Sequence, residues 1–122
     1  MEENKILIID DDNRNIYALS AVLKSRGYNI VASTSAVEGM QVLQSDPKIK
    51  VVLMDMMMPD MDGYEAIAEI RKNASLTSVP VIAVTAQAMP GDRQKTLVAG
   101  ADAYLSKPVN VDALLQLLEE YK

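Results

Sequence analysis

Five short apolar runs that resemble β-strands alternate along this chain with stretches of helical spacing, and four of the runs lead into charged or hydroxyl-bearing residues. Strands that alternate with helices of this size form βαβ units with a parallel sheet. Three runs are continuously apolar, as expected of central strands covered on both faces. The second run contains Asn29 and is expected at a sheet edge. The expected strands comprise residues 5–9, 28–32, 50–54, 80–84 and 103–105.

Start and stop signals for five helices lie between and after these runs. Gly27 stands where glycine commonly ends a helix, and Ser35 with Glu38 has the spacing of a capping box. Pro90 suits a first helical turn, and Gly100 closes the same helix. Right-handed crossovers leave few arrangements for these strands and helices. The expected helices comprise residues 13–26, 35–45, 63–73, 90–100 and 110 onward.

The composition excludes several classes of function. A chain of 122 residues corresponds to one domain, which we expect to span residues 1–122. Its net charge of −5 argues against nucleic acid or an anionic membrane as the main partner. The absence of cysteine removes disulfides and thiolate chemistry, and the absence of histidine removes the commonest general base. No apolar run reaches the roughly 20 residues of a membrane span and no signal peptide begins the chain, so we expect a cytoplasmic protein.

Polar side chains follow four of the predicted strands at the point where each strand ends. Asp10 and Asp11 follow the first strand, Asp55 the third, Thr85 the fourth and Lys107 the fifth. Ligands of open parallel sheets bind outside the carboxyl ends of the strands, so these side chains are expected to converge. Three carboxylates, a hydroxyl and an ammonium suit a divalent cation and a phosphoryl group.

Each of these residues also has an ordinary structural interpretation. The aspartates at 10–12 could cap the first helix, Asp55 could be a turn residue, Thr85 an ordinary strand residue and Lys107 an exposed lysine. One cap needs a single carboxylate, however, and three clustered anions cost Coulomb energy unless a cation compensates. The sharper interpretation is a hard-cation site of oxygen ligands, in which Mg²⁺ keeps several waters. Asp55 would then be a carboxylate nucleophile of the kind that forms an aspartyl phosphate.

Residues beside these positions add weaker signals. The methionines after Asp55 are expected to fill loop and core, because thioethers select soft metals. Met57 would offer a cation its backbone carbonyl, which any residue type supplies. The bond between Lys107 and Pro108 is one where a cis peptide is affordable, and a cis bond could aim the lysine inward. Tyr104 could be no more than an aromatic residue of an edge strand.

The four motifs together resemble the receiver domain of two-component response regulators. They read Ile-Ile-Asp-Asp-Asp, then Leu-Met-Asp-Met-Met-Met-Pro-Asp-Met-Asp-Gly, then Val-Thr-Ala, then Ala-Tyr-Leu-Ser-Lys-Pro. The resemblance extends from Lys5 to the last predicted helix. It implies a flavodoxin-like, doubly wound parallel sheet of five strands in the order 2-1-3-4-5, with five helices and a switch point between strands 1 and 3.

The resemblance also assigns a phosphoacceptor and a metal site. Asp55 would accept the phosphoryl group. Asp11 would bind Mg²⁺ directly, Asp10 mainly through a bound water, and the Met57 carbonyl would complete the protein ligands. Met57 and Gln87 lie at positions that tune dephosphorylation in the family, so the lifetime of the acyl phosphate stays open.

The remaining site positions are assigned in the same way. Thr85 and Lys107 would hold phosphoryl oxygens, with help from the backbone amide of Ala86. Phosphorylation would draw Thr85 toward the new oxygens and let Tyr104, at the position of the family's switch aromatic, enter the vacated space. The readout surface would be the face made by the fourth helix, fifth strand and fifth helix.

These assignments imply a phosphoprotein of a two-component phosphorelay. The phosphoryl donor would be a phosphohistidine on a histidine kinase or histidine phosphotransfer domain, since this chain has neither histidine nor a nucleotide-binding loop. The readout would be a downstream protein target. The chain would catalyse only its own phosphorylation and dephosphorylation and would not be an enzyme in the usual sense. Whether it acts alone or within a hybrid histidine kinase stays open, although Asp-Asp-Asn-Arg-Asn looks like the receivers of hybrid kinases.

Two alternative functions belong to classes other than the phosphorelay receiver. A Mg²⁺-dependent phosphatase of the haloacid-dehalogenase type also uses an aspartyl phosphate, and Asp10 and Asp12 have its Asp-x-Asp spacing. Such enzymes need a substrate-binding segment that the sequence lacks. A phosphorylation-independent interaction module is the other alternative, but none of the chemical positions has been lost.

The first predicted helix carries a wide apolar arc. Either it is a well-buried helix, or part of the arc faces a partner. In the family this helix contacts the histidine donor, which favours a partner-facing patch of Tyr17, Ala18 and Ala21.

Overall fold

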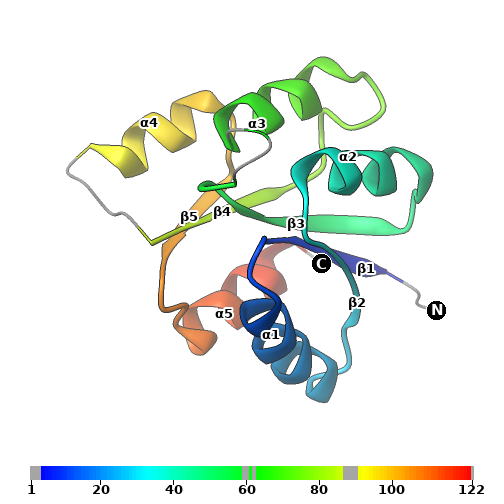
Figure 1. The fold of residues 1–122 in the computed structure, drawn as a ribbon, viewed down its shortest axis with the longest axis vertical. Helices are drawn as coiled ribbons and strands as arrows, with labels where there is room; N and C mark the ends of the chain where they lie inside the picture. The colour runs from blue at the N-terminus through cyan, green and yellow to red at the C-terminus, as the bar shows by residue number, and fades with distance from the viewer. Residues whose placement is uncertain (1–3, 59–60, 62, 87–90, 122) are drawn as a thin grey trace.

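The computed structural model describes residues 4–58, 61, 63–86 and 91–121, and within them five parallel strands form one sheet (Figure 1). The strand order is β2-β1-β3-β4-β5, so the expected flavodoxin-like order 2-1-3-4-5 is confirmed. The strand at the edge beside β1 is the run that contains Asn29, as predicted. The strands are β1 Lys5–Ile9, β2 Asn29–Ser33, β3 Ile49–Asp55, β4 Val81–Thr85 and β5 Ala103–Ser106.

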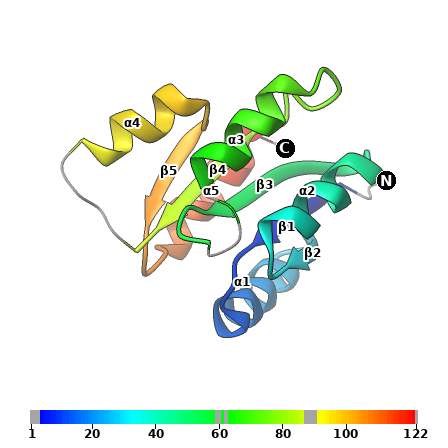
Figure 2. The ribbon, with the colours of Figure 1, turned by 45° about the horizontal axis from the view of Figure 1, so that its top comes forward.

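Helices cover both faces of the sheet. Figure 1 shows α1 and α5 on one face and α2 and α3 on the other, and Figure 2 shows α4 next to α3. The described residues contain five helices: α1 Asn13–Ser25, α2 Ala36–Ser45, α3 Gly63–Lys72, α4 Asp92–Ala99 and α5 Val111–Tyr121. This double covering explains why the central strands are apolar at nearly every position.

The side chains of β1 divide between two cores because successive strand residues point to opposite faces. Ile6 and Ile8 pack with Leu23 of α1 and Leu114 of α5. Leu7 and Ile9 pack in the other cluster, with residues of α2 and α3. Residues of β3 also divide between the two clusters, with Val52 and Met54 in one and Val51 and Leu53 in the other.

The predicted helix ends agree with the structure to within a residue or two. Ser35 caps α2, and its Oγ accepts a hydrogen bond of 3.0 Å from the amide of Glu38. Gly27 follows α1 with a φ of 92°, a backbone conformation that favours glycine. The fourth helix begins at Asp92 after Gly91, and the predicted first-turn residue Pro90 lies outside the described residues.

None of the helices that the structure describes has the length and apolar character needed to cross a bilayer.

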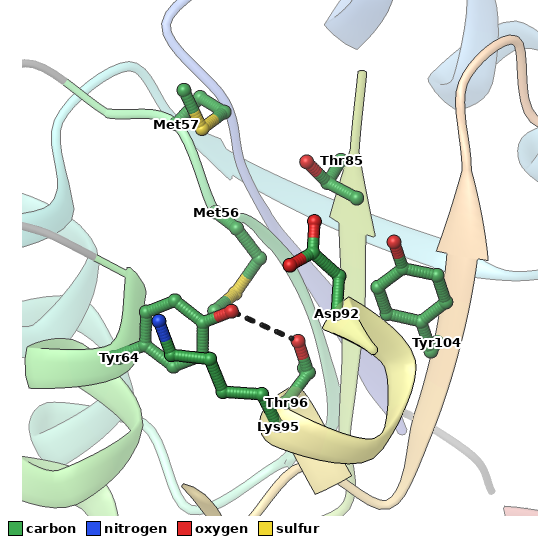
Figure 3. A pocket seen from close by; sticks show the side chains of 8 residues that line it. All are labelled: Met56, Met57, Tyr64, Thr85, Asp92, Lys95, Thr96 and Tyr104. Atoms are coloured by element: carbon green, nitrogen blue, oxygen red, sulfur yellow. Dashed lines mark hydrogen bonds between the residues drawn. The ribbon is translucent and has the colours of Figure 1, made fainter. Parts of the chain in front are cut away.

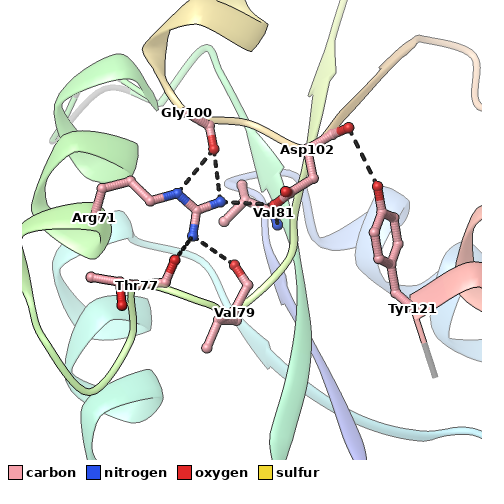
Figure 4. A network of polar contacts seen from close by, with 7 residues as sticks. All are labelled: Arg71, Thr77, Val79, Val81, Gly100, Asp102 and Tyr121. Atoms are coloured by element: carbon pink, nitrogen blue, oxygen red, sulfur yellow. Dashed lines mark hydrogen bonds and ion pairs between the residues drawn. The ribbon is translucent and has the colours of Figure 1, made fainter.

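A hydrogen-bond network centred on Arg71 ties the connections at the amino-terminal ends of β4 and β5 to α3 (Figure 4). The Arg71 guanidinium donates to the carbonyls of Thr77 and Val79 at 3.0 and 2.8 Å, and to that of Gly100 at 2.7 and 3.0 Å. It also lies 2.8 Å from the carboxylate of Asp102. This network lies at the end of these strands opposite Thr85, the last residue of β4, so it supports the site only through the strands.

Candidate functional site

The side chains predicted from the strand ends lie together at the carboxyl edge of the sheet. Asp10 directly follows β1, Asp55 ends β3, Thr85 ends β4 and Lys107 directly follows β5. The register aligns these ends, because Ile9 pairs with Met54, Asp55 with Val84 and Thr85 with Ser106. Short polar side chains at neighbouring strand ends therefore share one small volume.

Three carboxylates form a compact cluster at this edge. Asp10, Asp11 and Asp55 each offer an oxygen, and these oxygens all lie within 4.8 Å of one another. Asp10 and Asp55 are buried, whereas Asp11 is exposed. The third aspartate of the motif has a different role: the Asp12 carboxylate accepts a hydrogen bond of 2.9 Å from the amide of Arg14 and caps α1. The capping interpretation therefore holds for Asp12 alone.

Lys107 places its ammonium between two of the carboxylates. Its Nζ lies 3.2 Å from Oδ2 of Asp10 and 3.4 Å from Oδ2 of Asp55. Burial works to lower the pKa of Lys107, but the Asp55 and Asp10 carboxylates outweigh it and raise that pKa above its usual value. The lysine is therefore a permanent cation of the cluster at neutral pH. Its peptide bond to Pro108 is cis, as the sequence allowed.

The carboxylates of Asp10 and Asp55 also accept hydrogen bonds from neighbouring amides. Oδ1 of Asp10 accepts from the amide of Asp12 at 2.8 Å, and Oδ2 accepts from the side-chain amide of Asn15 at 3.3 Å. Oδ1 of Asp55 accepts from the amide of Met57 at 3.0 Å. These bonds orient the carboxylates of Asp10 and Asp55.

The pKa of Asp55 lies above its usual value. Burial is the main cause, and the Asp10 carboxylate adds to it. The Met57 amide and Lys107 act in the opposite direction without cancelling the effect. Ionisation of Asp55 therefore costs more free energy in the folded protein than in water.

The donor set fits a hard divalent cation. All three clustered side chains offer carboxylate oxygen, the ligand type that Mg²⁺ prefers, and exposed Asp11 leaves water access to the ion. A cation bound beside Asp55 would act against the burial and the Asp10 carboxylate, which raise the pKa of Asp55. The Met57 carbonyl as a ligand stays a prediction.

A pocket of about 180 Å³ adjoins the cluster on the α3–α4 side (Figure 3). Thr85 and Tyr104 both line it, and their role as a switch stays a prediction. The Tyr104 hydroxyl is buried, and it has no hydrogen-bond partner among the described residues. Burial raises the pKa of this hydroxyl, with smaller effects of Asp92 and Tyr64. The full lining is Met56, Met57, Tyr64, Thr85, Asp92, Lys95, Thr96 and Tyr104.

Three pocket residues that the sequence did not single out join α3 to α4. The hydroxyls of Tyr64 and Thr96 lie 3.3 Å apart. The Lys95 ammonium lies 4.8 Å from the centre of the Tyr64 ring, a cation–π distance. The one feature of the sequence that could have indicated these pocket residues is the spacing of Asp92, Lys95 and Thr96, which places them on one face of a helix. That spacing does not reveal which neighbour the face meets.

A mainly apolar groove of about 240 Å³ lies on the other side of the cluster, between α1 and the β5–α5 connection. Ala18 of the predicted patch lines it, and Tyr17, Ala18 and Ala21 are all exposed, Tyr17 by 79%. The opposite side of α1 carries fully buried Leu23. One side of the arc is therefore core and the other is exposed, and contact of the exposed side with a partner stays a prediction. The lining is Asn15, Ala18, Leu19, Val22, Val84, Lys107, Pro108, Val109 and Val111.

A family model of the response regulator receiver domain matches residues 6–119, nearly the whole chain. The chain belongs to the response regulator receiver domain family. The resemblance that the four motifs carried is thereby confirmed for this receiver domain.

Curated and solved relatives agree with this assignment. The receiver domain is 40% identical over 120 residues to the sensor histidine kinase RcsC of Salmonella typhi, a match that covers 98% of this chain and 12% of that kinase. A solved structure of the receiver domain of sensor histidine kinase PA1611 from Pseudomonas aeruginosa, with a magnesium ion in its active-site cleft, is 32% identical with a TM-score of 0.88 and covers 98% of both chains. The receiver domain of Ssk1 from Saccharomyces cerevisiae, solved with the histidine phosphotransfer protein Ypd1, is 26% identical with a TM-score of 0.86, covering 98% of this chain and 88% of the other.

The structure brings Asp10, Asp11, Asp55 and Lys107 together, and their assigned roles stay predictions. Ala86 directly follows β4 and is exposed, so its amide stands beside Thr85. Gln87 lies outside the described residues. Asn15 was present in the Asp-Asp-Asn-Arg-Asn motif, but nothing in the sequence assigned it a contact with Asp10.

Proposed function

We propose that this receiver domain accepts a phosphoryl group on Asp55 from a phosphohistidine of another segment or protein. The observation that carries the proposal is the position of Asp55: a buried carboxylate within reach of two further carboxylates and 3.4 Å from the ammonium of Lys107. A structural ion pair would need one carboxylate per lysine. The excess of anions suits a cation and a phosphoryl group that arrive together.

The proposed metal is Mg²⁺, held by the carboxylates of Asp10, Asp11 and Asp55 and by the carbonyl of Met57. When bound, it supplies positive charge beside the phosphoryl oxygens. Lys107 lies near Oδ2 of Asp10 and Asp55 and supplies a second positive charge from the strand on the other side of the site. Phosphoryl transfer is catalysed mainly by such positioning and charge neutralisation.

The transfer itself needs little further chemistry. A carboxylate oxygen of Asp55 attacks the phosphorus in line, the new P–O bond forms as the P–N bond of the phosphohistidine breaks, and the leaving nitrogen keeps the electron pair. Lys107, the Thr85 hydroxyl and the Ala86 amide contact the phosphoryl oxygens. The chain acts on itself in this scheme and turns over no free substrate. Hydrolysis of the acyl phosphate returns Asp55 to its starting state.

The groove beside α1 is the proposed docking surface for the donor. Its apolar lining includes Ala18 and Val22 and continues to Lys107, whose ammonium lies 3.4 Å from Asp55, so a protein that covers the groove lies next to the site. The complex of the Ssk1 receiver with the phosphotransfer protein Ypd1 supports a partner of this type. A histidine kinase or a histidine phosphotransfer domain is therefore the proposed donor, and the cytoplasm the proposed compartment.

The proposed output is a change in protein binding. Thr85 and Tyr104 line the same pocket, so a movement of Thr85 toward the phosphoryl group frees space beside the Tyr104 ring. The face made by α4, β5 and α5 would then present a different surface to a downstream protein. Phosphorylation adds charge at Asp55, and this added charge shifts the conformational equilibrium of the pocket residues Thr85 and Tyr104.

Labelling by acetyl phosphate tests the proposed function directly. Intact mass should show the gain of one phosphoryl group in the presence of Mg²⁺ and none in EDTA. Asp55→Asn should abolish the gain, whereas Asp112→Asn, which removes an exposed carboxylate from α5, should keep it. Labelling of the Asp55→Asn variant would refute the assignment of the phosphoacceptor.

A protein donor tests the docking surface separately. Ala18→Arg places a long charged side chain on the groove wall, so phosphotransfer from a cognate histidine phosphotransfer protein should fall by about tenfold or more. Labelling by acetyl phosphate, which is too small to need the groove, should stay within about twofold. Equal loss with both donors would mean that the substitution had damaged the site.

A further inference from the structure

We propose that Asn15 is a positioning residue that fixes the Asp10 carboxylate for the divalent cation. This inference rests on the proposed function. Asn15 lies in the first turn of α1, and its side-chain amide donates a hydrogen bond of 3.3 Å to Oδ2 of Asp10. Asn15 brings no carboxylate of its own, and its side-chain hydrogen bond is to Asp10, so we infer that its effect on a cation acts through Asp10.

Asp10 is held by three donors from three parts of the site. The Asp12 amide binds Oδ1, and Asn15 and Lys107 both approach Oδ2, at 3.3 and 3.2 Å. The Asp12 bond restrains one oxygen but leaves the carboxylate free to rotate about that contact. The contacts to Oδ2 complete its orientation. Asp10 is only 3% exposed, so water does little to replace a lost partner.

Lys107 and Asn15, the two donors to Oδ2 of Asp10, differ in their other contacts. Lys107 also lies 3.4 Å from Oδ2 of Asp55, and in the proposed reaction it turns to the phosphoryl oxygens. Asn15 is uncharged and has no such second role. It belongs to α1, which is anchored to the sheet through Leu23. Asn15 therefore keeps Asp10 in place at the moment when Lys107 changes partners.

The chemistry of the side chain suits this role. The asparagine amide donates a hydrogen bond without adding positive charge that would compete with the metal. An aspartate at this position would offer no donor and would add a further anion to the cluster. Groups that orient metal-binding carboxylates typically contribute 10–100-fold to metal affinity. The Asn15 bond is long and the side chain half-buried, so we expect the lower end of that range.

Metal titration of the whole chain tests the inference without any phosphoryl transfer. The Asp12 amide, which binds Oδ1 of Asp10, is the reporter in a two-dimensional NMR titration with Mg²⁺ alone. Asn15→Ala should raise the half-saturating Mg²⁺ concentration about tenfold. Asn15→Leu keeps the volume of the side chain while removing its donor, and it should give the same shift. Asn13→Ala changes an exposed asparagine two residues earlier and should shift the value less than twofold.

A second readout separates positioning from structural damage. Acetyl phosphate labelling of Asn15→Ala should need about tenfold more Mg²⁺ for half-maximal rate, while the rate at saturating Mg²⁺ stays within about twofold of wild type. Acetyl phosphate is chosen because Asn15 also borders the apolar groove, where a protein donor would introduce docking effects. Melting in EDTA checks that both variants are folded.

The outcomes distinguish this inference from the proposed function. If the wild-type chain neither binds Mg²⁺ nor becomes labelled, the proposed function fails. If the wild type does both and Asn15→Ala titrates like wild type, only the role of Asn15 fails. Wild-type metal affinity in Asn15→Leu alone would show that side-chain volume matters rather than the hydrogen bond, which also overturns the inference.

Discussion

The ammonium of Lys107 lies 3.4 Å from Oδ2 of Asp55, a residue 52 positions earlier in the chain. Asp55 ends β3 and Lys107 follows β5, so β4 separates their strands in the sheet. The Lys107 side chain therefore passes the carboxyl end of β4 to reach Asp55. It opposes the effect of burial on the Asp55 carboxylate without cancelling it.

Replacing Lys107 should impair phosphorylation more than folding. Lys107→Met removes the positive charge that the proposed mechanism places on the phosphoryl oxygens, so labelling by acetyl phosphate at saturating Mg²⁺ should fall about 100-fold. Lys72→Met, which changes an exposed lysine of α3, should label at the wild-type rate. Quench-flow or intact-mass time courses measure both. A Lys107→Met variant with wild-type kinetics would remove the lysine from the mechanism.

Asp55→Asn should stabilise the metal-free protein at neutral pH. Burial, followed by the Asp10 carboxylate, raises the pKa of Asp55 in the folded state. The folded state then binds this proton more tightly than the unfolded state. Wild-type stability therefore falls as pH rises from the unfolded carboxyl pKa of about 3.9 to the higher folded pKa, and stays level above it. Asparagine keeps an acceptor for the Met57 amide without the charge.

Thermal melts in EDTA test whether the substitution stabilises the metal-free protein. At pH 7 the Asp55→Asn variant should melt about 2–5 °C above wild type. The difference should shrink as pH falls below about 4, where the wild-type carboxyl is protonated in both states. A variant that melts below wild type at pH 7 would mean that the pairing with Lys107 outweighs burial.

Mg²⁺ should stabilise the fold because it binds the folded arrangement of Asp10, Asp11 and Asp55. At a concentration of 100 times its dissociation constant, a ligand specific for the folded state adds about 2.7 kcal/mol. For a chain of this length that corresponds to a rise of about 8–12 °C in melting temperature. Asp11→Asn should lose most of the rise. An unchanged wild-type midpoint at saturating Mg²⁺ would contradict the metal site.

The contact between α3 and α4 should contribute measurably to stability. Tyr64→Phe removes the hydroxyl 3.3 Å from Thr96 while keeping the ring that faces Lys95. Thr96 is only 1% exposed, so the free energy of unfolding should fall by about 1 kcal/mol in urea titrations. Tyr17→Phe removes a hydroxyl from a residue that is 79% exposed and should change stability by less than about 0.5 kcal/mol. Equal effects of the two variants would argue against the contact.

Arg71→Lys should destabilise the protein without changing the site. The guanidinium contacts three backbone carbonyls and Asp102 at once, and an ammonium cannot reproduce that planar set of donors. We expect a loss of about 2 kcal/mol in urea titrations. The Mg²⁺ dissociation constant should stay within about twofold, because the network lies at the opposite end of β4 and β5. A large change in Mg²⁺ affinity would show that the two ends are coupled.

Much of the fold was predictable because its signals are local. Runs of apolar residues in β3 and β4 report strands covered on both faces, and Ser35 and Gly27 mark helix ends through groups only a few residues away. The start of the fourth helix was less well predicted. It was expected from residue 90, which lies outside the described residues, and the described helix begins at Asp92 after Gly91.

The sequence by itself determined which residues stand at the strand ends, and the order of the four motifs was enough to indicate the receiver family and its chemistry. Only the tertiary structure decided which donor approaches each oxygen. The contact of Asn15 with Asp10, the pairing of Tyr64 with Thr96 and the carbonyls around Arg71 depend on how helices pack on the sheet. Backbone propensities act over a few residues, whereas these contacts are set by the packing of whole elements, to which many distant side chains contribute at once.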